Sequence, residues 1–409
     1  MNVKFLADLW SQKTLRDLAL INYGRDPSAI LDADGQYPVY GTSGSERLGT
    51  DFLYDGDSII LGRKGSIERV HFATGRFWTI DTAYFLSDFN DTLPKWLFYF
   101  LTSFDLRSLN EATGVPSLSR DLLYKINVPT PPKPEQTKIA EVLSTVDRAI
   151  EQTEALIAKQ QRIKTGLMQD LLTRGIDENG NLRSEETHQF KDSPLGRIPV
   201  EWKVRQFGYL VSEILDNRGR TPPLDYYGQN ELLEVASLRN VEKNPDYSTV
   251  TKRVSDEIFA SPYFRQHLTA GDVLVSTVGS VGLTAYIDIP RGGIAQNIIG
   301  LRFKDEAWGE FMFYWTRSAQ FSSELTKVVM DAVQPSLKRP HLLSFQLACP
   351  ALEEQKELAN IINSAVEIVE QYMIQLHKLH RMKIALMQDL LTGKVRVTPL
   401  LSKPREAGA

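Results

Sequence analysis

The chain has 409 residues, which at about 150 residues per domain predicts two or three domains. Hydrophobic residues make up 42% of the chain and charged residues 24%, a composition typical of globular proteins, and no apolar run is long enough to span a bilayer. The formal net charge of −4 argues against a generic nucleic-acid binder, so any affinity for phosphates must come from a local basic face or from partner chains.

The first 130 residues predict a mixed α/β domain. They start with MNVKFLADLW, which lacks the features of a secretory signal, and we therefore expect a cytoplasmic protein. Short β-rich runs occur at 57–65 and 69–75, and a helical stretch lies near 95–108. The runs contain a glycine-flanked basic turn that is a candidate for contact with DNA, because Arg and Lys read guanine edges and phosphates. Its candidate residues are Arg63, Lys64, Ser66, Arg69 and His71. The alternative is an ordinary solvated hairpin.

Residues 131–175 predict the first long helix. Apolar residues follow one another at spacings of three and four, as on one face of an amphipathic helix. This apolar face consists of Ile139, Val142, Leu143, Val146, Ile150, Ile157, Ile163, Leu167 and Leu171. Prolines precede the helix and Gly175 follows it, as expected at helix ends. The next segment, 176–199, is polar and lacks periodicity, which predicts an exposed linker.

Residues 200–350 predict a second α/β domain, with β-rich runs at 272–282 and 297–303 and a helical stretch at 306–328. The turn at 276–280 is uncharged, so it would contact phosphates through backbone N–H groups or small hydroxyls. The candidates for DNA contact here are Ser276, Thr277 and Ser280 in this turn, Arg218 and Arg220 in an earlier loop, and Gln296 and Asn297. Gln and Asn can read adenine bidentately, but Asn297 also suits the cap of a turn.

Residues 351–393 predict a second long helix, followed by a tail at 394–409. In both helices the first half is acidic and the second half basic: the net charges are −2 and +3 in the first helix and −4 and +4 in the second. Antiparallel pairing places acidic halves beside basic halves, so we expect an antiparallel coiled coil. The outward faces are candidates for docking partner subunits, although a solvated charged face is the simpler interpretation. The candidates are Lys159, Arg162, Lys164, Lys378, Arg381 and Lys383.

The two halves of the chain are a tandem repeat. LMQDLLT occurs at 167–173 and again at 386–392, and the same offset of 219 residues aligns 116–173 with 335–392 without a gap. A polar loop therefore precedes each helix, and it suits contact with DNA or a partner, although Pro-Ser is also an ordinary helix entry. The candidate DNA contacts in these loops are Arg120 in the first copy and Gln334, Lys338 and Arg339 in the second.

Two divergent α/β domains, each followed by one of two similar helices, resemble the specificity subunits of type I restriction-modification enzymes. The resemblance spans the whole chain and includes YPVYGTSG at 37–44, GDSIILGRKGS at 56–66, the paired PSLSRDLL and PSLKRPHLL, and RIPVEWKV at 197–204. The first repeat begins near Trp10 and lacks the opening found in the second. In that family the domains are target-recognition domains related by a pseudo-twofold axis, and the helices space two DNA half-sites.

The resemblance also implies the partners. We expect double-stranded DNA, two modification subunits that use S-adenosylmethionine to methylate adenine N6, and restriction subunits that use ATP and Mg for cleavage. We expect neither a cofactor nor a catalytic residue on this chain, and no membrane. The lone Cys349 excludes an intramolecular disulfide, and the six scattered histidines, including the pair His377 and His380, do not predict a metal site.

Two other classes of protein remain as alternatives. An amino-methyltransferase would need a glycine-rich cofactor loop, and only an imperfect NPPY-like motif is present, at 244–247. There is no GxxxxGK[ST] phosphate loop either. A structural adaptor, in which two protein-binding domains are held apart by a coiled coil, fits the same repeat. Steep salt dependence of binding would distinguish a DNA reader from such an adaptor.

Overall fold

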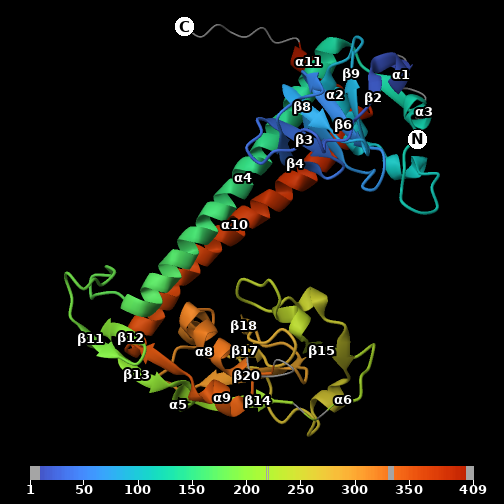
Figure 1. The fold of residues 1–409 in the computed structure, drawn as a ribbon. Helices are drawn as coiled ribbons and strands as arrows, with labels where there is room; N and C mark the ends of the chain where they lie inside the picture. Colours follow the sequence, from blue (N-terminus) through green and yellow to red (C-terminus); the bar gives the residue numbers. More distant parts are fainter. Residues whose placement is uncertain (1–9, 218, 220, 330–335, 402–409) are drawn as a thin grey trace. The chain divides into compact units, whose positions relative to one another are not determined.

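The computed structural model describes residues 10–217, 219, 221–329 and 336–401. The chain forms two compact units, which we call unit 1 (residues 1–155 and 374–409) and unit 2 (residues 156–373). These units are not the two sequence repeats. Each unit contains one globular portion, the beginning of the long helix that follows it, and the end of the other long helix (Figure 1).

Unit 1 is built on a four-stranded antiparallel sheet. In spatial order its strands are β2 (Leu20–Tyr23), β9 (Ala83–Ser87), β6 (Ser58–Gly62) and β7 (Val70–Ala73). Every residue of β6 and β9 is buried, because both faces of these strands are covered. A second sheet has the order β4 (Gly44–Gly49), β3 (Tyr37–Gly41), β8 (Arg76–Thr79) and β5 (Tyr54–Asp55). A ribbon of β1 (Ser11–Thr14) and β10 (Asn127–Thr130) leads into the long helix.

Short helices complete unit 1. They are α1 (Leu15–Leu18), α2 (Pro94–Ser103), a 3-10 turn (Leu106–Leu109), α3 (Arg120–Tyr124) and α11 (Thr398–Leu401). Helix α2 packs against β6 and β7, and its buried Trp96, Leu97 and Leu101 enter the core of the unit. The sheet and helix predicted at 57–75 and 95–108 are thereby confirmed.

Unit 2 repeats this plan. Its main sheet has the order β14 (Val211–Asp216), β20 (Ile298–Phe303), β17 (Val273–Ser276) and β18 (Thr284–Tyr286). A second sheet consists of β16 (Lys252–Val254), β15 (Asn230–Leu233) and β19 (Gly293–Ile294), and a ribbon is formed by β13 (Lys203–Gln206) and β21 (Gln346–Cys349). The helices are α5 (Phe207–Leu210), α6 (Asp256–Phe259), α7 (Gly309–Trp315), α8 (Ala319–Val329) and α9 (Arg339–Ser344), with 3-10 turns at Val235–Leu238 and Tyr247–Thr249. The predicted tandem repeat of mixed α/β domains is confirmed.

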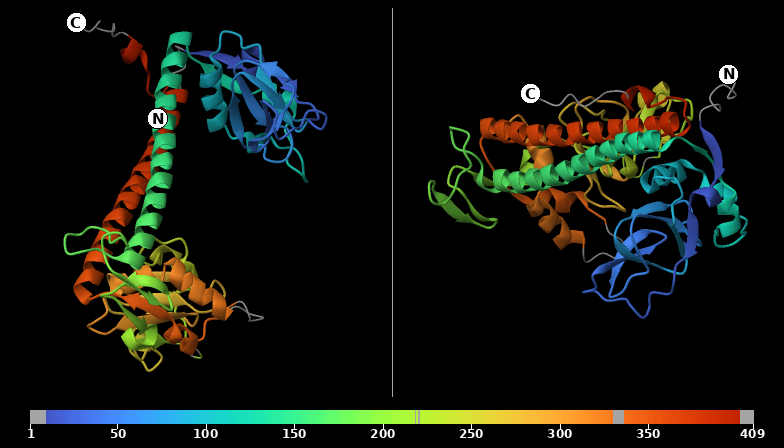
Figure 2. Two further views of the ribbon diagram at one scale, coloured as in Figure 1. Left: turned by 60° about the vertical axis from the view of Figure 1, so that its left-hand side comes forward. Right: turned by 90° about the horizontal axis from the view of Figure 1, so that it is seen from above.

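The two long helices are α4 (Lys133–Arg174) and α10 (Leu352–Leu391). Inside each unit, the halves of the two helices lie side by side and antiparallel (Figures 1 and 2). In unit 1, Ile139 and Leu143 of α4 share a core with Leu390 of α10. In unit 2, Leu172 of α4 shares a core with Leu358 of α10. The predicted antiparallel pairing is confirmed, and an apolar seam holds it together.

The charge pattern of the helices is realised differently in the two units. In unit 1, Lys383 of α10 forms an ion pair with Asp147 of α4, with 2.6 Å between Nζ and Oδ1. Lys164 occupies the corresponding position in α4, but its ammonium pairs with Glu242 of the globular portion of unit 2. The acidic and basic halves therefore meet as the sequence predicted in unit 1, whereas in unit 2 the lysine fixes the helix to its domain.

The repeated Glu-Gln pair at the start of each long helix has a structural role. In unit 2, Trp202 Nε1 donates to Glu354 Oε2 at 3.1 Å, and the Arg183 guanidinium pairs with the same carboxylate at 2.5 Å. The neighbouring Gln355 accepts from the backbone N–H of Trp308 at 2.8 Å, which satisfies a free donor at the start of α7.

Unit 1 contains a similar arrangement, except that the Trp10 indole N–H has no hydrogen-bond partner. Arg396 Nε donates to Glu135 Oε2 at 2.9 Å, and the Arg396 guanidinium lies 5.6 Å from the centre of the Trp10 ring. Gln136 accepts from the Leu93 N–H at 2.7 Å, at the start of α2. The end of each long helix is thereby fixed to the beginning of the other.

Most side chains of the linker predicted at 176–199 are exposed, but the segment is also anchored to unit 2. Ile176 and Ile198 are buried in the core of this unit, and the Arg183 side chain pairs with Glu354. The end of the segment forms a hairpin of β11 (Phe190–Ser193) and β12 (Gly196–Pro199). A polar segment can thus be held in place by a few apolar and charged side chains.

Candidate nucleic-acid interface

In unit 1 the basic turn after β6 is joined to the polar loop before α3. Gly65 N–H donates to the Pro116 carbonyl at 2.9 Å, and Leu118 N–H donates to the Arg63 carbonyl at 2.9 Å. Gly65 has a φ of +90°, a conformation that glycine adopts without strain. Two segments that the sequence indicated separately, around residues 63 and 120, thus form one surface.

The aromatic ring of Tyr23 is the centre of this surface. The guanidinium of Arg63 lies 5.1 Å from the ring centre and that of Arg120 lies 4.9 Å from it. Tyr23 is 45% exposed, and its ring packs edge-on against Tyr84 at 5.2 Å. Burial raises the pKa of Tyr84, whose hydroxyl donates to the Leu118 carbonyl at 3.1 Å. A guanidinium stacked on a ring keeps its N–H edge available for hydrogen bonding to a base or phosphate.

The sequence did not single out Tyr23, which is the last residue of β2. Its neighbours in space come from residues 63 and 120, far along the chain, and no local spacing signals that meeting. The other candidates of the basic turn differ in exposure. Lys64 and Arg69 are exposed, Ser66 is half-buried, and His71 is half-buried with Nε2 3.3 Å from the Thr42 carbonyl.

The equivalent turn of unit 2 has the same backbone frame. Leu337 N–H donates to the Thr277 carbonyl at 2.8 Å, as Leu118 does to Arg63 in unit 1. Val278 bridges to Ser336, as Lys64 bridges to Ser117. This correspondence places the two polar loops in equivalent positions of the two units.

The side chains of this second turn correct the expectation from sequence. Ser276 is fully buried, and its hydroxyl donates to the Ser280 carbonyl at 2.5 Å and accepts from Leu283 N–H at 2.8 Å. Thr277 is 1% exposed and its hydroxyl lies 3.3 Å from the Asn297 carbonyl. Both hydroxyls stabilise the turn from inside, so neither side chain is available to DNA. Ser280 is exposed and accepts a hydrogen bond from Arg239 at 3.2 Å.

Arg239 is therefore an exposed cation at the second turn that the sequence did not indicate. Lys338 and Arg339 are also exposed, and Arg339 lines a cavity of about 630 Å³ together with Asn217 and Arg265. Gln296 is half-buried and its amide donates to the Thr221 hydroxyl, while Asn297 is exposed. The candidates Arg218, Arg220 and Gln334 lie outside the described residues.

The candidates for partner binding divide into two groups. Lys159, Arg162, Lys378 and Arg381 are exposed on the helices, as expected for an outward face. Lys164 and Lys383 are half-buried and occupied by Glu242 and Asp147, so these two do not belong to a free outward face. Helical spacing predicts the face of the helix on which a lysine lies, but it does not predict which acidic side chain pairs with that lysine.

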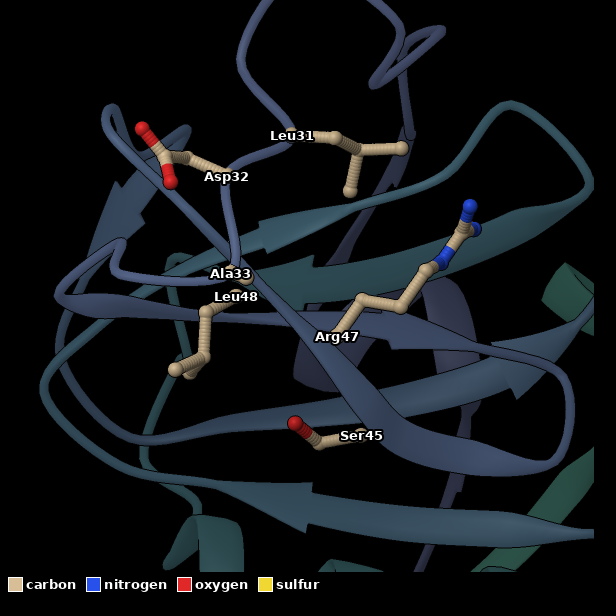
Figure 3. A pocket seen from close by; sticks show the side chains of 6 residues that line it. All are labelled: Leu31, Asp32, Ala33, Ser45, Arg47 and Leu48. Atoms are coloured by element: carbon tan, nitrogen blue, oxygen red, sulfur yellow. The ribbon is translucent and has the colours of Figure 1, made fainter.

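Figure 3 shows an open cavity of about 630 Å³ in unit 1, lined by Leu31, Asp32, Ala33, Ser45, Arg47 and Leu48. The carboxylate of Asp32 and the guanidinium of Arg47 point in different directions, so the lining does not assemble an acid-base pair. The NPPY-like motif begins a 3-10 turn, in which Asp246 accepts from the Ser248 N–H at 3.0 Å.

The described part of the chain contains no group of three or more His, Cys, Asp or Glu side chains that could hold a metal ion. Among the described residues, no helix is long and apolar enough to cross a membrane.

Comparisons with known proteins agree with this architecture. The family described as type I restriction modification DNA specificity domain matches residues 7–160 and 199–377. The chain is 28% identical to the type I restriction enzyme MjaVIII specificity subunit of Methanocaldococcus jannaschii, over 96% of this chain and 94% of that protein. It is 22% identical to the EcoDI specificity subunit of Escherichia coli, over 85% and 79% of the two chains.

Solved structures show the same fold. The type I restriction-modification S subunit from M. genitalium aligns with a TM-score of 0.64 and 16% identity, over 95% of this chain and 98% of that one. The fold and the duplicated turn-and-loop surface define a protein of two similar mixed α/β domains. The chain belongs to the type I restriction-modification DNA specificity family.

Proposed function

We propose that this chain selects an interrupted DNA sequence and directs adenine-N6 methylation, and restriction, by partner subunits. The observation that carries the proposal is the duplicated turn-and-loop surface. Its backbone frame is the same in both units, with Leu118 bonded to Arg63 and Leu337 bonded to Thr277. The exposed side chains on that frame differ, as expected if each unit reads a different half-site.

The two surfaces also differ in where their charges lie. Unit 1 presents Arg63, Lys64 and Arg120, whereas unit 2 has an uncharged turn that receives Arg239 from a neighbouring segment and is joined to a loop that carries Lys338 and Arg339. Each phosphate contact made by these cations would contribute about −0.9 to the slope of log K against log salt. The partner subunits supply the remaining contacts, S-adenosylmethionine, ATP and Mg, and they carry the chemistry on the base.

The first test is to express the neighbouring modification subunit with and without this chain in a host that lacks adenine methylation. Methylated adenines are then mapped across the genome. A two-part motif that appears only in the presence of this chain supports the proposal and gives both half-sites. A soluble complex without methylation, and without salt-sensitive DNA binding, would favour the adaptor alternative.

A further inference from the structure

Two adjacent tyrosines in unit 2 are almost fully exposed, although their rings are largely apolar. Tyr226 and Tyr227 are 85% and 84% exposed, and their rings lie edge-on at 5.3 Å from each other. Leu224, in the same loop, is 53% exposed. Aromatic rings usually find cover when a protein folds alone, so adjacent exposed rings indicate a binding surface.

The tyrosines are held on a rigid turn. Asp225 N–H donates to the Arg253 carbonyl at 2.9 Å, and Gly228 N–H donates back to the Asp225 carbonyl at 3.0 Å. The Asp225 carboxylate also accepts from the Tyr227 N–H at 2.9 Å. At Gly228 a Cβ would lie 2.3 Å from the Val254 carbonyl oxygen, so the turn is pressed against β16. The rings are presented in a fixed position rather than on a free loop, which lowers the entropy cost of binding.

Arg253 of β16, whose carbonyl accepts from the tyrosine turn, is one of two arginines that share a buried carboxylate. Arg253 of β16 and Arg291 both donate to Glu231 Oε1, at 2.7 and 2.6 Å. The Glu231 side chain is only 4% exposed, whereas Arg253 and Arg291 are 38% and 57% exposed. The Arg291 guanidinium also stacks on the Tyr247 ring at 4.7 Å. One buried carboxylate thus orients two partly exposed cations and leaves this group with one net positive charge, and the backbone of Arg253 joins it to the tyrosine turn.

We propose that the Tyr226–Tyr227 turn inserts against a base step of the DNA while Arg253 and Arg291 hold the adjacent phosphates. Rings that pack on bases beside oriented guanidiniums match the two parts of a nucleotide, its flat apolar base and its anionic phosphate. A protein partner would use the rings but would not need the paired cations. The inference rests on the proposed DNA recognition and adds a specificity element that acts by unstacking and not by hydrogen bonds to base edges.

The test uses the full chain in complex with its modification subunit. The probes are duplexes that carry the mapped motif, with 2-aminopurine at successive positions of the half-site that unit 2 reads. For the native complex we expect increased fluorescence at one step, because 2-aminopurine brightens when it loses its stacking neighbour. The double variant Tyr226→Ala and Tyr227→Ala should abolish that increase and weaken binding about tenfold or more.

Two controls separate stacking from other effects. The double variant Tyr226→Phe and Tyr227→Phe keeps the rings and should retain both the signal and most of the affinity. Tyr209→Ala removes another exposed tyrosine of unit 2, one that is 49% exposed and stacked with Arg205 at 5.0 Å, and should change neither.

Salt dependence tests the arginines separately. Arg291→Gln removes one cation and leaves Arg253 on Glu231, so the slope of log K against log salt should decrease by about one. The tyrosine-to-alanine variant should lower the affinity at every salt concentration and leave the slope unchanged, because it removes no charge.

Two outcomes would overturn the inference. One is unchanged affinity and fluorescence in the tyrosine-to-alanine complex. The other is loss of the modification subunit from that complex with DNA affinity retained, which would assign the rings to a protein contact. Failure of the proposed function would look different, because the native complex itself would then have no motif to bind.

Discussion

The arginines of the candidate interface are positioned by side chains that are distant in the sequence. Arg63 and Arg120 both lie close to the Tyr23 ring, with their guanidiniums 5.1 and 4.9 Å from its centre, and Arg63 Nη1 also donates to the Asp81 carbonyl at 3.1 Å. The Nε atom of Arg120 is buried with no hydrogen-bond partner. The ring therefore orients the Arg120 guanidinium without using its terminal N–H groups, which remain for a base or phosphate.

Arg120→Ala should consequently relax one position of one half-site. Loss of a bidentate contact to a base costs about 1 to 3 kcal/mol of discrimination. The measurement is the methylation motif produced by the complex, together with its affinity for the native site. Arg148→Ala, an exposed arginine of the same unit, is the matched control and should leave the motif intact. Equal relaxation of both half-sites would assign Arg120 to assembly and not to reading.

Glu354 offers a second test at the residue scale. Its carboxylate pairs with Arg183, and the two side chains are only 13% and 10% exposed. Glu354→Ala leaves a nearly buried guanidinium uncompensated and removes the acceptor of Trp202, so the free energy of unfolding should fall by about 3 to 5 kcal/mol. Denaturant titration measures this. Glu185→Ala, which breaks an exposed pair with Arg197, should cost no more than about 1 kcal/mol. Similar losses in the two variants would refute this role for the buried pair.

The sequence predicted which segments lie in the candidate interface better than it predicted what each side chain does there. The sequence correctly indicated the turn around Arg63 and the loop around Arg120, because glycine and repeated polar residues mark them. It could not show that the side chains of Ser276 and Thr277 are buried. The sequence pattern of a short strand does not indicate which hydroxyls bond to the backbone of the following turn. It also missed Arg239, which no motif marks.

At the scale of elements, the long helices are ended by glycines in the left-handed conformation. Gly175 has a φ of +64° and Gly393 a φ of +72°. At Gly393 a Cβ would touch the Trp10 ring at 3.4 Å, whereas at Gly175 it would lie 2.2 Å from Glu354 Oε1 and 2.5 Å from the Trp202 ring. The same cap is therefore more tightly enclosed in unit 2.

Alanine substitutions at three glycines should separate these effects. Gly393→Ala should destabilise unit 1 by about 1 kcal/mol through backbone strain alone, and Gly175→Ala should cost more, because the new methyl also clashes with the Glu354–Arg183 pair and with Trp202. Gly166→Ala lies inside α4 with nothing within 4 Å and should stabilise the protein by about 0.5 to 1 kcal/mol. Thermal unfolding of the three variants checks the order. Equal effects of Gly175→Ala and Gly393→Ala would show that the side chains around Gly175 move away without cost.

Elements were the most predictable level. Apolar spacings of three and four over some forty residues predict a helix in any environment, and the buried strands β6 and β20 stand out as apolar runs. The hairpin of β11 and β12 was missed because its strands are short and polar. The hairpin is held against unit 2 by side chains such as Ile198, which is buried in the core of that unit.

At the scale of the whole molecule, the chain exchanges its helix ends between units. The LMQDLLT segment that closes the first repeat packs in unit 2, through Leu171 and Leu172, and the one that closes the second repeat packs in unit 1, through Leu390 and Leu391. The sequence showed the duplication, but it did not show which unit each LMQDLLT segment packs in, because two identical segments fit either unit equally well. Each globular unit thus receives an identical closing segment, which leaves its DNA-facing loops free to diverge.

Because both long helices run from one unit to the other, a matched insertion tests whether they space the half-sites. Seven residues added after Ala155 in α4 and after Met373 in α10, at the boundary between the units, keep the apolar seam in phase. Each insertion lengthens a helix by about 10.5 Å, close to three base pairs of B-DNA.

The expected methylation motif keeps both half-sites and has a gap about three base pairs longer. Insertion in α4 alone is the control: it leaves one helix without a partner of equal length and should abolish assembly. An unchanged gap in the doubly lengthened chain would mean that the bound subunits, and not these helices, set the separation of the half-sites. A changed half-site with an unchanged gap would mean that the insertion disturbed a recognition surface, which the thermal stability of the variant would reveal independently.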